Sequence, residues 1–291
     1  MRQALNLTVL GGLIAIALTG ASHAQTIPPR SASRAAPGMP AAPQAVPIPA
    51  GRQVYYAPGD FRWMNDKPHV QRATVIGETV SFSIVQMDGK APAALTHPAE
   101  TVLQGQGGRV ALDNTPAPVG RLDVAVVAPG PQSTVRVSGN ETAQLLVFTA
   151  TPVAPGMVDA SGANPQRVSS TGTSVRVFDT MPWIGEKGKS RFKAFAGDSC
   201  TFVIWRIPAA AMRGTGGPGH HHTIEQISYL VEGHSTTRIG DQIRTVGPGT
   251  LFMIPADVDH MGFEAVNNED IILLDFQPFI RKDLLSQQAV K

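Results

Sequence analysis

Gly219-His220-His221-His222-Thr223-Ile224-Glu225-Gln226 is the stretch that decides the fold and the chemistry of this 291-residue chain. Side chains alternate between the two faces of an extended segment, so His220 and His222 lie on one face and His221 lies on the other. Gln226 follows at the start of a strand-like run, in the same even-numbered register. The stretch therefore predicts a chelating pair of imidazoles with a carboxamide beside it.

A second stretch, from Gly249 to His260 through Pro255, supplies a third imidazole. Imidazole nitrogens suit zinc, iron, nickel and copper, and an amide oxygen adds a neutral ligand that leaves positions open for water or substrate. The pattern is therefore typical of a catalytic metal site rather than a closed structural one. The predicted ligands of one divalent ion are His220, His222, Gln226 and His260.

Glu225 is the rival of Gln226 for the fourth ligand position. Its odd-numbered register turns it toward the opposite face of the segment, so we favour Gln226. The amide lacks the formal charge of a carboxylate and does not act as a base. His-rich runs also occur as loose metal-binding loops, but here four ligands, several glycines and a proline stand at separate fixed spacings, which favours a defined site.

The two stretches resemble the paired motifs of the cupin superfamily, Gly-x5-His-x-His-x3-(Glu or Gln)-x6-Gly and Gly-x5-Pro-x-Gly-x2-His-x3-Asn. They read here as Gly214-x5-His220-x-His222-x3-Gln226-x6-Gly233 and Gly249-x5-Pro255-x-Asp257-x2-His260. The departures are Asp257 in place of Gly, Glu264 in place of Asn, and Gln226 in place of the commoner Glu. The resemblance implies a cupin barrel over residues 180–280 that holds zinc, nickel, manganese or iron.

The chain also contains two related halves. Thr74–Ile84 aligns without gaps to Ala194–Ile204, and Gln144–Phe148 is similar to Ile272–Phe276. Repetition of this size indicates duplication of a whole domain. The first half lacks the ligands, with only His97 near an expected place. The sequence therefore resembles a bicupin in which one lobe binds no metal.

Short runs rich in β-branched and aromatic residues, punctuated by Gly or Pro, predict strands throughout, and helical periodicity is almost absent. The predicted fold is all-β, with two jelly-roll cupin barrels in tandem. We expect a first lobe without metal ligands at residues 53–160 and a metal-binding lobe at 161–291.

The N-terminus reads as a targeting segment. A basic residue, an apolar run and a small-residue cleavage pattern predict a signal peptide over residues 1–24. Residues 25–52 are rich in Pro and Ala and predict a disordered linker. We therefore expect a periplasmic or secreted protein that has no contact with the membrane once the signal is removed.

The charge balance limits the partners. A net charge of +2, with no basic stripe interleaved with aromatic residues, gives no case for nucleic acid. A small-molecule substrate is the expected partner. Cupins often associate through their sheets, so the resemblance also implies a homodimer.

Asp275 and Arg281 follow His260 at a spacing similar to the tail of the small cupins that convert unsaturated uronate sugars. That resemblance implies that Asp275 is an acid/base group and that Arg281 binds a substrate carboxylate through its planar guanidinium. The alternative is an ordinary salt bridge between the two at a barrel rim, where such a pair contributes little.

Three functions stay open at this point. The first is an exported metalloenzyme that acts by proton transfer on a small oxygenated or carboxylated substrate such as a sugar acid. The second is a dioxygenase of the quercetinase type. The third is a cupin that binds a small molecule or a metal without turnover.

Overall fold

A computed structural model describes residues 46–89, 92–113, 115, 117–138, 141–150, 173–211, 219–261 and 264–278. The β-branched and aromatic runs of the sequence form its strands, and every pairing between named strands is antiparallel. The helical segments of these residues are single 3₁₀ turns: η1 (Pro58–Asp60), η2 (Phe178–Thr180) and η3 (Ala209–Ala211). The prediction of an all-β fold is confirmed.

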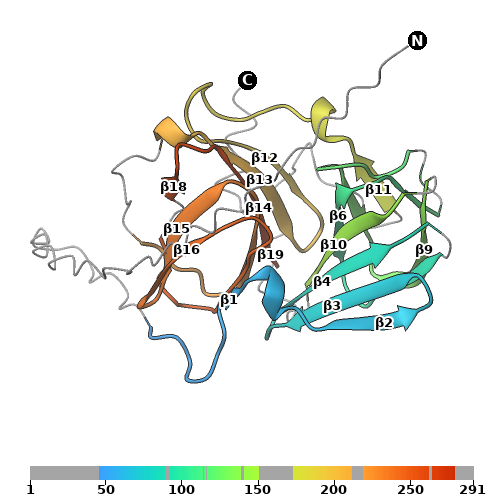
Figure 1. Cartoon of the computed structure of the whole chain (residues 1–291), viewed down its shortest axis with the longest axis horizontal. Helices are drawn as coiled ribbons and strands as arrows, with labels where there is room; N and C mark the ends of the chain where they lie inside the picture. The colour runs from blue at the N-terminus through green and yellow to red at the C-terminus, as the bar shows by residue number, and fades with distance from the viewer. Residues whose placement is uncertain are drawn as a thin grey trace, which may run out of the picture. The chain divides into compact units, whose positions relative to one another are not determined.

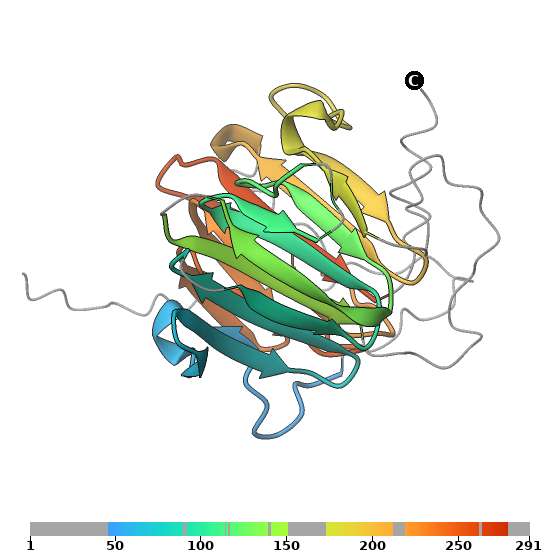
Figure 2. The same ribbon diagram turned by 90° about the vertical axis from the view of Figure 1, so that its right-hand side faces the viewer.

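The first lobe consists of a seven-stranded sheet and a three-stranded sheet, drawn mainly in blue and green in Figure 1 and seen nearly face-on in Figure 2. The larger sheet has the order β11-β8-β6-β10-β4-β3-β2 and the smaller the order β5-β9-β7. Their strands are β2 (Trp63–Lys67), β3 (Val70–Ile76), β4 (Val80–Met87), β5 (Ala93–His97), β6 (Thr101–Gly107), β7 (Val110–Leu112), β8 (Val124–Val127), β9 (Gly130–Val137), β10 (Ala143–Ala150) and β11 (Thr173–Arg176).

The second lobe repeats this plan with a six-stranded and a three-stranded sheet. The larger has the order β1-β17-β14-β19-β13-β12 and the smaller the order β16-β15-β18. Their strands are β1 (Tyr55–Tyr56), β12 (Arg191–Ala196), β13 (Thr201–Ile207), β14 (Gln226–Glu232), β15 (His234–Ile239), β16 (Gln242–Val246), β17 (Leu251–Ile254), β18 (Glu264–Val266) and β19 (Ile271–Gln277).

The strand registers reproduce the internal repeat found in the sequence. Phe148 of β10 lies opposite Phe82 of β4, and Phe276 of β19 lies opposite Phe202 of β13. These are the pairs that the two sequence alignments place at equivalent positions. The repeat therefore extends from sequence to hydrogen-bond register.

The lobes exchange strands at two places. β1 pairs with β17 of the second lobe, although it lies in the range expected for the first, and Figure 1 shows it in blue beside the orange strands. β11 pairs with β8 of the first lobe, although it lies in the range expected for the second. Both strands are short and cap the edge of a sheet, where an unpaired edge would otherwise be exposed.

Four apolar clusters lie among the described residues, and the smallest of them is a group around Phe192. One, the interlobe core, contains residues of both large sheets, while two others fill the first and second barrels separately. At the centre of the interlobe core the ring of Phe148 lies 5.2 Å from that of Phe82, 5.2 Å from that of Phe202 and 5.7 Å from that of Phe276. Each large sheet therefore has one face buried against the other lobe.

Several predictions fall outside the described residues. These are the signal peptide at residues 1–24, most of the linker at 25–52, and Arg281. Within the described residues, the structure contains no helix of sufficient length and apolar character to cross a bilayer.

Replacement of Phe148 tests the shared core. We expect Phe148→Ala to lower the free energy of unfolding by about 3–5 kcal/mol, because a fully buried ring that contacts both lobes leaves a cavity. Urea denaturation followed by fluorescence measures the change. Ile76→Ala is the control, since Ile76 is 80% exposed, and a change beyond about 0.5 kcal/mol is not expected there. Equal effects of the two substitutions would contradict this account of the core.

Candidate metal centre

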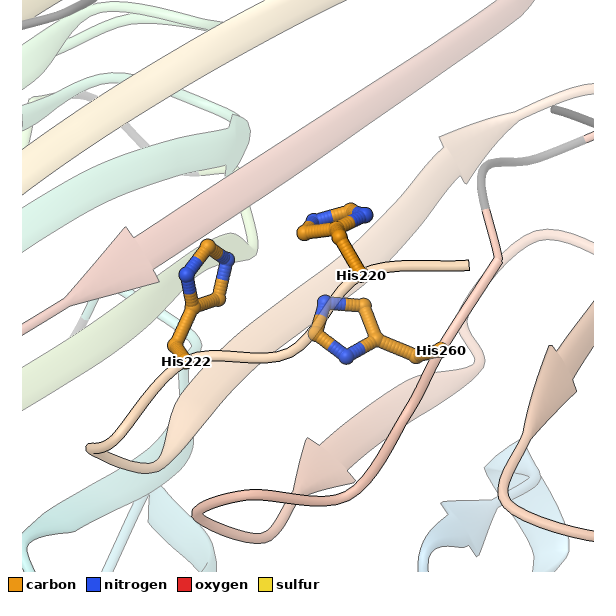
Figure 3. A group of neighbouring side chains, drawn as sticks. All are labelled: His220, His222 and His260. Atoms are coloured by element: carbon orange, nitrogen blue, oxygen red, sulfur yellow. The ribbon is translucent and has the colours of Figure 1, made fainter. Parts of the chain in front are cut away.

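Two chain segments bring the three predicted imidazoles together. His220 and His260 form an antiparallel bridge in which each backbone N–H donates to the carbonyl of the other, at 2.9 and 2.8 Å. A further backbone bond, from the N–H of Asp257 to the carbonyl of His222, is 2.7 Å long. The segment that precedes β14 is thus tied to the segment that follows β17, and Figure 3 shows the three rings gathered between them.

The three rings lie close enough together to be candidate ligands of one metal ion. Each of His220, His222 and His260 offers a nitrogen, and these three atoms lie within 4.8 Å of one another. The ring centroids are 4.3 to 5.3 Å apart. His220 is exposed, His222 is half-buried and His260 is buried, so the cluster is open on one side. This arrangement is capable of binding a divalent metal.

His260 is held in the state that a ligand needs. Its Nδ1 lies 3.0 Å from the carbonyl oxygen of Val258 and is placed to donate to it, which leaves Nε2 with a free lone pair. Nε2 is buried and has no hydrogen-bond partner among the described residues. Burial lowers the pKa of His260 to about 4, so the ring is neutral at physiological pH. A buried acceptor atom of this kind fits a metal ion better than it fits an apolar core.

Gln226 is linked to His222 through the amide of Gln277, and its own amide orientation is defined by its neighbours. Its Nε2 donates to Oγ of Ser228 at 3.0 Å and faces Oδ1 of Asp275 at 3.3 Å. Its Oε1 accepts a hydrogen bond of 2.7 Å from Nε2 of Gln277, and that same nitrogen lies 3.3 Å from Nε2 of His222. The oxygen of Gln226 therefore lies on the side of the histidines and its nitrogen on the side of Asp275.

Asp275 belongs to a polar layer beneath Gln226. Its Oδ2 accepts a 2.7 Å bond from Nε1 of Trp205, and its Oδ1 accepts a 2.5 Å bond from Oγ of Ser228. Its side chain is half-buried. Asp275 thus contacts the side chain of Gln226, a predicted ligand, directly. Its predicted partner Arg281 lies outside the described residues, so the salt-bridge alternative stays untested.

Glu225, the rival ligand, extends away from the histidines. Its side chain is 2% exposed, and Oε2 accepts hydrogen bonds from the backbone N–H groups of Glu78 and Thr79 in the first lobe. Oε1 is paired with Arg52. Glu225 therefore faces away from the histidines, as its odd-numbered register predicts.

The departure at Asp257 has a local explanation. The residue adopts φ +59°, in the left-handed region that glycine enters freely and that Asp and Asn tolerate better than other residues. Asp257 meets the same backbone requirement as the Gly usual in the motif. The loop before His260 is therefore closed in spite of the substitution.

The first lobe carries different residues at the equivalent positions. Counting from the shared strand register, Leu95, His97, Thr101 and Ser133 correspond to His220, His222, Gln226 and His260. Only one of the four is a common metal ligand. Both ring nitrogens of His97 are buried without a hydrogen-bond partner among the described residues, and burial lowers its pKa.

Sequence reasoning missed three residues of the site: Trp205, Ser228 and Gln277. The signal for two of them was present, because Ser228 and Gln277 each lie two positions from a predicted site residue on the same strand and so share its face. Trp205 comes from β13 and is brought in only by its pairing with β19.

A separate cavity of about 370 Å³ lies away from the three histidines and is lined by Arg52, Gly77, Met253 and five neighbours.

No family model matches the sequence, and no curated protein matches it. Solved structures do match. AerE from Microcystis aeruginosa has a TM-score of 0.58 at 15% identity and covers 77% of this chain and 97% of its own. Oxalate decarboxylase of Lactobacillus farciminis, solved as a formate complex, has a TM-score of 0.60 at 12% identity, with 80% and 88% covered.

A cupin 2 conserved barrel domain protein from Leptotrichia buccalis has a TM-score of 0.52 at 11% identity and covers 74% of this chain and 91% of its own. At these identities the likeness concerns the fold. Together with the repeated pair of antiparallel sheets, it confirms the prediction made from the two motifs and the duplication: the chain has the cupin fold in its two-barrel, bicupin form.

Proposed function

We propose that this chain is a metal-dependent enzyme that acts on a small oxygenated or carboxylated substrate in the barrel of the second lobe. The observation that carries the proposal is the cluster of three imidazole nitrogens within 4.8 Å of one another. The buried Nε2 of His260, which lacks a partner among the described residues, adds to it. His220, His222 and His260 would hold the ion, with Oε1 of Gln226 as the fourth ligand.

The charge of the proposed ligand set favours an anionic substrate. Three neutral imidazoles and an amide leave the full positive charge of a divalent ion in the site, and a bound cation of this kind is the largest local charge. When bound, the ion would polarise a carbonyl or carboxylate oxygen and lower the pKa of a coordinated water. A substrate carboxylate is the natural complement of that charge.

The fold comparison supports the same substrate class. One solved neighbour is an oxalate decarboxylase, and oxalate is a small dicarboxylate. The uronate sugars suggested by the spacing of Asp275 also carry a carboxylate. Both lines favour a small organic acid. Arg281 remains the proposed group for binding a substrate carboxylate.

Asp275 is the proposed group for proton transfer. Its carboxylate is half-buried, accepts hydrogen bonds from Trp205 and Ser228, and lies next to Gln226. In this role it takes a proton from the substrate and returns it to another atom of the same molecule.

Two neighbouring histidines, His221 and His222, provide a test of the proposed metal ligands. We expect His222→Ala to lose at least tenfold in affinity for zinc, because one of the three imidazoles is removed, while the first lobe stays folded. His221→Ala is the matched control, since the alternation of an extended segment assigns its side chain to the opposite face, and it should bind zinc as the wild type does. Elemental analysis and titration with a chelating indicator measure both. Equal zinc binding by the two variants would show that the ligands are assigned wrongly.

The role of Asp275 is tested by Asp275→Asn. We expect turnover of a small carboxylate, screened among unsaturated uronates and oxalate, to fall at least about 100-fold, as removal of a general acid/base does. Zinc stoichiometry should be unchanged. Retained turnover would remove the acid/base role, and so would a parallel loss of metal affinity, which would instead assign Asp275 to orienting the amide of Gln226.

Export is a separate proposal that rests on the sequence of residues 1–24. We expect the mature protein, expressed with its own N-terminus in a Gram-negative host, to begin at Gln25. N-terminal sequencing of the periplasmic and cytoplasmic fractions tests this. A full-length protein confined to the cytoplasm would contradict it.

A further inference from the structure

Glu225 joins the proposed metal-ligand segment to the first lobe. Its Oε2 accepts bonds of 2.8 and 2.9 Å from the backbone N–H groups of Glu78 and Thr79, and Thr79 Oγ1 lies 3.5 Å away. These donors belong to the turn between β3 and β4. Two N–H groups on one carboxylate oxygen form a charge-assisted anchor, which is stronger than a neutral hydrogen bond.

A matching contact runs from the first lobe to the second. Glu100 of the first lobe accepts bonds of 2.8 Å from the backbone N–H groups of both Asp198 and Ser199, in the turn between β12 and β13 of the second lobe. The hydroxyl of Ser199 donates at 2.9 Å. Glu100 immediately precedes Thr101 as Glu225 immediately precedes Gln226. The two carboxylates are therefore related by the internal repeat.

Each anchor depends on a glycine. A Cβ at Gly77 would overlap the carboxylate of Glu225, and a Cβ at Gly197 would overlap that of Glu100. The two glycines are equivalent in the sequence repeat. Each turn thus leaves room for the carboxylate of the opposite lobe to reach its backbone.

The two anchors differ in what lies beside them. Glu225 also pairs with Arg52, which in turn pairs with Glu78, so a cation joins the carboxylate to the turn that it contacts. Glu225 lies between two of the proposed ligands, whereas Glu100 lies between His97 and Thr101, in the lobe without the histidine cluster. The anchors share their structural contacts and differ in their distance from the cluster.

We propose that Glu225 is a positioning residue that fixes the proposed metal ligands against the first lobe. The inference rests on the function proposed above. Residues 221–225 form no strand pairing. The contacts that tie the segment down include the bond from Asp257 to the carbonyl of His222, the contact of His222 with Gln277, and the carboxylate of Glu225. Loss of the Glu225 anchor would let His222 move relative to Gln226, which β14 holds in place.

With this role for Glu225, the first lobe contributes to the metal site although it lacks a common metal ligand at three of the four equivalent positions. The turn at residues 77–79 supplies the donors, and the segment that contains Arg52 supplies the cation. The geometry of the metal site in one lobe therefore depends on the backbone of the other. A purely structural clamp would instead stabilise the lobe interface and leave the metal affinity unaffected.

The repeat provides the control that separates these two roles. We compare Glu225→Gln with Glu100→Gln in the full chain, using Zn²⁺ alone as the probe. Both variants should lower the melting temperature of the metal-free protein by similar amounts, because both lose a charge-assisted anchor. Zinc affinity, measured by competition with a chelator, should fall about 10–100-fold in Glu225→Gln, as for other groups that orient a ligand, and stay within twofold in Glu100→Gln.

The outcomes are distinguishable. If the wild type takes up no zinc, nickel, manganese or iron, the proposed function fails and the inference fails with it. If the wild type binds zinc and the two variants bind it equally well, the inference alone is overturned. If Glu225→Gln does not fold, Gly77→Ala takes its place, because the added Cβ would displace the carboxylate of Glu225 from its backbone donors; unchanged zinc affinity in that variant would overturn the proposal.

Discussion

The packing of the two large sheets against each other is the constraint on which the rest of the structure depends. Once one face of each sheet is buried in the interlobe core, the period of two along a strand sends every second side chain into a barrel interior. In β19, Leu274 and Phe276 face the interlobe core, while Asp275 and Gln277 belong to the site. β14 repeats the pattern, with Ile227 and Tyr229 in the core and Gln226 and Ser228 in the site. The same apolar contacts that join the lobes thus assemble the polar groups.

A buried polar layer of this kind is stable only if its donors and acceptors are matched. Trp205 and Ser228 donate to Asp275, Gln226 donates to Ser228, and Gln277 donates to Gln226. This chain of hydrogen bonds has a direction, because it begins from a carboxylate that only accepts. An acceptor at the base of the layer orients the nitrogen of Gln226 downward and its oxygen toward the histidines. The identity of the residue beneath Gln226 therefore decides which atom of its amide faces upward.

Sequence spacing was sufficient for the fold, the repeat and the three histidines, because each depends on local period or on a short motif. It was not sufficient for contacts between distant segments. The backbone donors to Glu225 lie about 150 positions away in the chain, and no side-chain pattern reveals a backbone partner. The exchange of β1 and β11 between lobes was missed for a related reason: strands of two and four residues carry too few side chains to specify a partner. Asp257 departs from the sequence motif, yet it adopts the positive φ that the Gly usual at this position would adopt.

His97 shows what the first lobe has kept and what it has lost. Its neighbours at the equivalent positions are Leu95, Thr101 and Ser133, so no second imidazole shares the place that the repeat gives it. A buried imidazole without a partner costs about 1–3 kcal/mol, and burial keeps the ring neutral by lowering its pKa. The fold tolerates this cost because the large apolar interface and the Glu100 anchor do not pass through that position. The interlobe contacts and the ligand positions lie on separate faces of the same strands, so one barrel can lose its ligands while it continues to support the other.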